Sequence, residues 1–99
     1  MIYTLSSMHR LHLADLTTPV TVTIWRTPEG QRVEAHVSHA IHTPAQASPV
    51  RPTLASNTDW TTCTNLRIAR HIEVQYVTFY DMAVAAGHAP QEWWLVPVE

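Results

Sequence analysis

Residues 20–42 carry the pattern that most restricts how this chain can fold. Residues 20–25 (VTVTIW) alternate apolar and polar side chains and are rich in β-branched residues, which is typical of a strand with one buried face. The turn-forming sequence TPEG follows at 27–30. Beyond it the alternation resumes, with one face made of Val33, Ala35, Val37, His39 and Ile41. The pattern predicts an antiparallel β-hairpin over 20–42.

Residues 65–86 fit a helix better than a strand. Their first half, 65–75, also alternates at the period of a strand, so both interpretations stay open there. The whole run is too long for one ordinary strand, and it ends in an alanine-rich segment followed by Gly87. An apolar stripe at helical spacing consists of Ala69, Ile72, Tyr76, Phe79, Ala83 and Ala86. We therefore predict a helix over about 65–86.

The remaining segments complete an α+β domain. Residues 2–13 suit one strand or two short ones, and residues 93–98 suit an edge strand because Pro97 cannot donate to a ladder. The window 43–58 contains three prolines, so we expect a connecting loop within a single domain, 1–99. We predict a small antiparallel sheet, built around the hairpin, that packs against the one long helix.

Composition excludes several classes of protein. Cys63 is the only cysteine of the 99 residues, so neither an internal disulfide nor a multi-cysteine zinc site can form, and a reducing, cytoplasmic setting is expected. The net charge of −2 disfavours a nucleic-acid-binding regulator, which we keep as a remote alternative. No apolar run is long enough to cross a bilayer, and no signal peptide is expected.

Seven histidines make metal binding the first chemistry to consider, and three of them stand at positions 36, 39 and 42. On a strand, residues three apart point to opposite faces. His36 and His42 share a face but lie about 20 Å apart at the usual rise per residue. We therefore predict no metal site, with His36 and His42 as the fallback ligands. A histidine-dependent metal-binding protein or small metal-dependent enzyme is the first alternative function.

No catalytic motif is present. The sequence has no nucleophile-elbow pattern, and its two glycines, Gly30 and Gly87, cannot form a phosphate-binding loop. If the chain were an enzyme, the neighbourhood of His71 and Glu73 would be the first place to search. We expect a protein without enzymatic activity and without a cofactor.

Binding to another protein is the favoured function. Trp93 and Trp94 are adjacent, so on a strand one would enter the core and the other would stay exposed beside Glu92. A basic spot on the helix would supply further contacts. The predicted binding residues are Trp93, Trp94, Arg67, Arg70 and His71. We expect a phage or mobile-element accessory protein, for example an anti-defence inhibitor such as an anti-CRISPR protein, that blocks its partner; the edge strand 93–98 could also support a homodimer.

Overall fold

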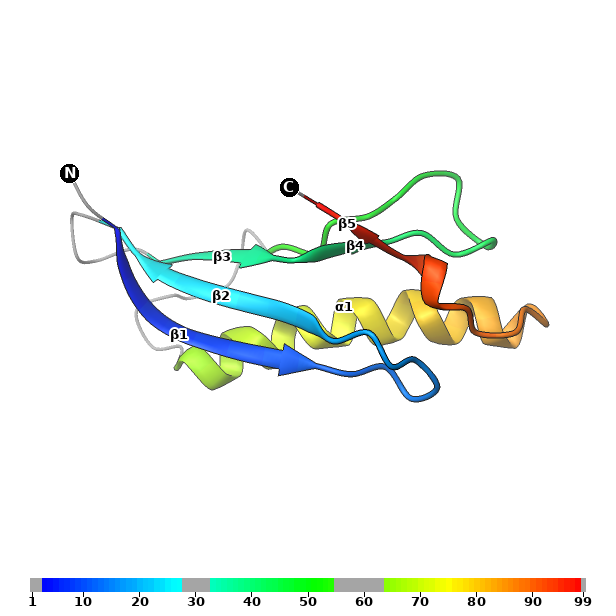
Figure 1. Cartoon of the computed structure of the whole chain (residues 1–99), viewed down its shortest axis with the longest axis horizontal. Helices are drawn as coiled ribbons and strands as arrows, with labels where there is room; N and C mark the ends of the chain where they lie inside the picture. Colours follow the sequence, from blue (N-terminus) through cyan, green and yellow to red (C-terminus); the bar gives the residue numbers. More distant parts are fainter. Residues whose placement is uncertain (1–2, 28–32, 55–63, 99) are drawn as a thin grey trace.

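The computed structural model describes residues 3–27, 33–54 and 64–98. Figure 1 shows a sheet with the helix α1 lying along one face. The elements in chain order are β1 (Thr4–Leu11), β2 (Val20–Arg26), β3 (Val33–Val37), β4 (His39–Ile41), α1 (Asn65–Ala85), the 3₁₀ turn η1 (Glu92–Trp94) and β5 (Leu95–Pro97). The strands form a three-stranded sheet, in the order β1-β2-β3, and a two-stranded sheet of β4 and β5. The predicted α+β fold, with a small antiparallel sheet against one long helix, is confirmed.

The predicted hairpin is confirmed over its first part and ends earlier than expected. β2 and β3 are antiparallel, with Val22 opposite Val37 and Ile24 opposite Ala35. The last residues of the predicted turn lie outside the described ranges. β1 extends the sheet on the other side of β2, with an irregularity in register between Leu5 and Ser7. β4, which we had assigned to the hairpin, pairs with β5 instead of β2.

Ser38 lies between β3 and β4, where the chain stops pairing with β2 and begins to pair with β5. Its backbone N–H donates to the carbonyl of Thr21 at 2.9 Å, and its own carbonyl accepts from the N–H of Val98 at 3.0 Å. Its side-chain oxygen also accepts from the N–H of Thr21 at 2.8 Å. Because one residue serves β2 and the C-terminal segment together, the strand can continue without leaving backbone groups unpaired.

The helix begins and ends where the sequence predicted, which resolves 65–75 as helix. Thr64 caps it by accepting a hydrogen bond from the N–H of Arg67 at 3.2 Å. At the other end Gly87 has a φ of 95°, in the region that favours glycine after a helix. The buried residues of α1 are Ile68, Ala69, Ile72, Tyr76, Tyr80 and Ala83. Ala86, which we had placed on the buried stripe, is exposed.

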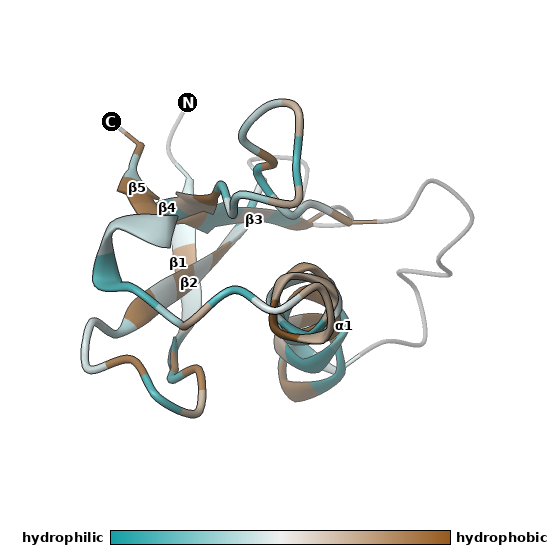
Figure 2. Ribbon diagram, turned by 90° about the vertical axis from the view of Figure 1, so that its right-hand side faces the viewer, coloured by the Kyte–Doolittle hydropathy of each residue, from teal (hydrophilic) through white to brown (hydrophobic). Residues whose placement is uncertain are grey.

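The core lies between α1 and the inner face of the sheet. Helix residues such as Ile72 pack in one cluster with Val22 and Ile24 of β2, and all three are fully buried. Tyr76 adds a polar link, because its hydroxyl donates to the carbonyl of His39. Figure 2 shows that α1 covers only one side of the sheet. The outer face of α1 and the opposite face of the sheet are left without a covering layer in the described chain.

The loop after β4 is held close to the sheet over its described part, 43–54. Ile41 and Val50 exchange two backbone hydrogen bonds of 2.9 Å. The side chain of Gln46 donates to the carbonyl of Ile41 and accepts from the N–H of Thr43. Further along, the N–H and carbonyl of Thr53 both bond to the side-chain amide of Gln75 on α1. Prolines prevent a regular strand here, yet the loop is anchored at both of its described ends.

Among the described residues, no helix combines the length and the hydrophobicity needed to span a membrane.

Candidate functional site

The adjacent tryptophans Trp93 and Trp94 have opposite environments. Both belong to η1, so the strand predicted over 93–98 was wrong for these two positions and begins only at Leu95. Trp94 is completely buried, whereas the side chain of Trp93 is 61% exposed. Their ring centroids are 6.4 Å apart and the rings are nearly perpendicular. Trp94 therefore belongs to the core, and only Trp93 of this predicted pair offers a contact surface.

Glu92 fixes the turn that carries Trp93. Its carboxylate accepts hydrogen bonds from the backbone N–H groups of Thr17 and Thr18 and from both threonine hydroxyls, over distances of 2.7–3.1 Å. These threonines belong to the connection between β1 and β2, far from Glu92 in the sequence. The contact ties the C-terminal segment to the N-terminal half of the chain.

The same hydrogen bonds change the acidity of Glu92. Donation from the hydroxyl and N–H of Thr18 and from the N–H of Thr17 lowers the pKa of Glu92 from 4.5 to about 2. Hydrogen bonds to the charged form favour it, so this carboxylate stays ionised through almost the whole acidic range.

Tyr80, the buried neighbour of Trp94, interacts with two further carboxylates, those of Asp15 and Asp81. The ring of Tyr80 meets that of Trp94 edge to face, with centroids 5.8 Å apart. The hydroxyl of Tyr80 donates to Asp15 at 3.0 Å. Burial, and then this hydrogen bond, raise the pKa of Tyr80, with a smaller contribution from the charge of Asp81. Asp15 and Asp81 are both exposed, and the hydrogen bond from Tyr80 places Asp15 beside the ring that packs on Trp94.

The predicted basic spot lies elsewhere. Arg67 and Arg70 are exposed on the first turns of α1, and His71 is half-buried. Figure 1 shows η1 near the other end of this 21-residue helix, whose length is about 30 Å at the usual rise. The structure therefore separates the tryptophan and arginine parts of the predicted site into two surfaces.

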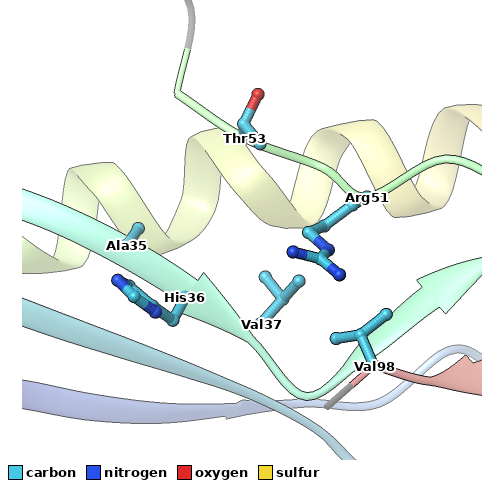
Figure 3. A pocket seen from close by; sticks show the side chains of 6 residues that line it. All are labelled: Ala35, His36, Val37, Arg51, Thr53 and Val98. Atoms are coloured by element: carbon cyan, nitrogen blue, oxygen red, sulfur yellow. The ribbon is translucent and has the colours of Figure 1, made fainter.

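A pocket that sequence analysis did not predict lies beside β3. It has a volume of about 420 Å³. Figure 3 shows the side chain of Arg51 reaching from the loop toward Val98, with His36 to one side on β3. The other lining residues are Ala35, Val37 and Thr53. The pocket lies where the chain that follows the Ile41–Val50 bridge passes β3.

The histidines and the candidate acid–base pair are dispersed. His36 is exposed on β3, while His42 is half-buried after β4. The described residues include no group of three or more His, Cys, Asp or Glu side chains placed to hold a metal ion. His71 and Glu73 are two residues apart on a helix and so do not face each other. Cys63 lies outside the described residues.

No protein-family model, no curated protein and no solved structure matches this chain.

Proposed function

We propose that this chain is a non-enzymatic module that docks on another protein through Trp93 and blocks it. The observation that carries the proposal is a tryptophan side chain, 61% exposed, on a turn that the rest of the fold holds in place. Tryptophan is among the residues most enriched at the energetic centres of protein interfaces. An indole left in water with no internal contact over most of its surface has apolar area to contribute to a partner.

The turn is fixed on both sides of Trp93. Glu92 is held by Thr17 and Thr18, and Trp94 is buried against Tyr80. A turn whose two neighbouring side chains are already held loses little backbone entropy on binding, and preorganisation of this kind increases affinity. This rigidity distinguishes Trp93 from an exposed aromatic residue on a mobile tail.

The charges nearby specify the chemistry of the partner. Asp15, which accepts from the Tyr80 that packs on Trp94, is exposed at this end of the molecule, and α1 has no basic residue in its last turn. The C-terminal end of a helix is itself electronegative. The partner we propose is a protein with an apolar pocket for the indole and a rim rich in lysine or arginine.

The proposal extends to the biological setting in which the protein acts. We propose a cytoplasmic inhibitor of phage or mobile-element origin, such as an anti-defence or anti-CRISPR protein. The single cysteine fits a reducing compartment and supports the cytoplasmic setting. A tryptophan inserted into a functional pocket of the partner would account for inhibition without catalysis.

The test compares three baits in a lysate capture followed by mass spectrometry: the unaltered chain, Trp93→Ala and the control Met8→Ala. Met8 is 56% exposed on β1, so the control removes a similarly exposed apolar side chain from another element. Each protein that depends on Trp93 is then purified and its Kd measured by calorimetry. We expect Trp93→Ala to weaken binding by at least about 30-fold, equivalent to about 2 kcal/mol, and Met8→Ala to leave it unchanged.

Two further results complete this test. The association rate constant should fall as salt is added, because the proposed rim is basic and the docking end is acidic. A capture profile that is identical for the unaltered chain and Trp93→Ala would refute docking through Trp93.

A further inference from the structure

The solvent-facing side of α1 carries a line of apolar residues interrupted by two opposite charges. Leu66 is 52% exposed, Val74 61%, Val77 39% and Val84 44%. Arg70 and Asp81 are also exposed. The line consists of Leu66, Arg70, Val74, Val77, Asp81 and Val84. Its steps of three and four residues follow the period of the helix, so the six side chains form one stripe along its axis.

The two charges of the stripe are not paired with each other. Arg70 and Asp81 lie on the same side of α1 but about 16 Å apart at the usual rise per residue, too far to pair with each other. No ion pair joins either of them to another described residue. Their charges are therefore available to a second surface.

The stripe is complementary to itself when it is turned end to end. Arg70 and Asp81 lie equally far from the midpoint between Gln75 and Tyr76, and so do Val74 and Val77. We propose that a second copy of this chain covers the stripe, with the two α1 helices antiparallel about a two-fold axis at that midpoint. Arg70 then faces Asp81 of the other copy twice, Val74 faces Val77 twice, and Leu66 lies near Val84.

The charges also select the direction of the two helices. A parallel pair in register would place Arg70 against Arg70 and Asp81 against Asp81, and like charges at an interface are unfavourable. The antiparallel pair converts the same residues into attractions at both ends of an apolar centre. A two-fold interface of this kind uses one patch on both copies.

The dimer predicted from the sequence, through the edge strand 93–98, would have a smaller interface. β5 has only three residues, Leu95–Pro97, and Pro97 has no N–H to donate. α1 offers a much longer surface over Leu66–Val84. The α1 dimer does not rest on the proposed docking of Trp93, which belongs to another surface.

The test is a charge-reversal cycle read by sedimentation equilibrium. The unaltered chain should form a dimer below about 100 µM. Arg70→Asp and Asp81→Arg should each raise the dimer Kd at least about 10-fold, because each places two pairs of like charges in contact. The double variant R70D/D81R exchanges the charges and should restore dimerisation. Met82→Ser is the matched control, because Met82 is 52% exposed on α1 but lies off the stripe.

A second variant separates loss of the dimer from loss of the fold. Val77→Asp should give a monomer whose circular dichroism and cooperative unfolding remain those of a folded chain. The proposal is overturned if the unaltered chain is monomeric at that concentration, or if the double variant dimerises no better than the single ones. Dissociation by Val96→Asp on β5, with no effect of Val77→Asp, would also overturn it and identify the edge-strand dimer instead.

Discussion

At the scale of single residues, Glu92 does more for this fold than its exposed position implies. It accepts hydrogen bonds from two consecutive backbone N–H groups, those of Thr17 and Thr18, which have no strand partner to bond to. A carboxylate that accepts from several donors at once is held in one orientation relative to them. In this way the connection before β2 and the turn before β5 are held against each other.

Replacing Glu92 tests this role through pH. Its pKa is lowered from 4.5 to about 2, so its contribution to stability is fully present above pH 4.5 and is lost as pH falls from 4.5 toward 2. Glu92→Gln should therefore reduce Tm at pH 7, and Tm should then fall less steeply between pH 4.5 and 2 than in the unaltered chain. Thermal unfolding followed by circular dichroism at several pH values measures both effects.

The control for this prediction is Glu73→Gln, which removes one negative charge from α1 at a distance from Thr17 and Thr18. For this variant, Tm should decrease with falling pH between 4.5 and 2 as steeply as it does for the unaltered chain. Equal slopes for the unaltered chain and the Glu92→Gln variant would show that the threonine contacts do not stabilise the fold.

At the scale of elements, the strand from Val33 to Ile41 is one extended segment with two successive partners. β3 pairs with β2, and β4 pairs with β5. The exchange occurs at Ser38, whose hydroxyl supplies an acceptor for Thr21 where the ladder is interrupted. A small side chain with an acceptor oxygen suits this junction, because an alanine would fill the space but leave the N–H of Thr21 with no bond from that side.

Ser38→Ala should destabilise the chain by about 1–3 kcal/mol, which is the cost of leaving a partly buried donor unsatisfied. Urea unfolding at pH 7 measures the difference. Ser38→Thr keeps the oxygen and should recover most of the loss, while Ser48→Ala, in the exposed loop, should change stability by less than about 0.5 kcal/mol. A neutral Ser38→Ala would mean that water replaces the hydroxyl without cost.

At the scale of the whole molecule, one helix layer on one sheet layer produces one core, and residues 3–27, 33–54 and 64–98 leave the two outer faces uncovered. The principal extents are 45 × 25 × 22 Å, so the molecule is elongated along α1. Both faces of α1 are apolar in part, but the described residues cover only one of them. The covered face stabilises the fold, whereas the open face is the basis of the proposed dimer, and the turn at the end of α1 is the basis of the proposed docking.

The single core makes stability depend strongly on the side of α1 that is altered. Ile72 is fully buried, so Ile72→Ala should cost about 2–5 kcal/mol through lost burial and the cavity left behind. Met82→Ala, on an exposed position of the same helix, should cost less than about 1 kcal/mol. Urea unfolding of both variants measures the contrast, and similar losses for the two would place the core on a different face of α1.

The sequence by itself determined the elements whose signal is local. The period of two over 20–42 predicts a hairpin, which the structure shows as far as Val37, and the helical stripe and Gly87 predict α1, because each pattern reports which side of the chain must leave water. It also restricted the candidate site to a few residues, and it indicated that one of Trp93 and Trp94 would be buried.

Only the tertiary structure decided the contacts between distant segments. Glu92 and Thr17 are 75 positions apart, and nothing in the residues near either one identifies the other as its partner. The same holds for the exchange of partners at Ser38 and for the pocket beside Arg51. Period and propensity report what a segment buries, but the partner of a hydrogen bond depends on how the whole chain packs. For this reason the elements could be predicted, whereas the fixed turn under Trp93 could not.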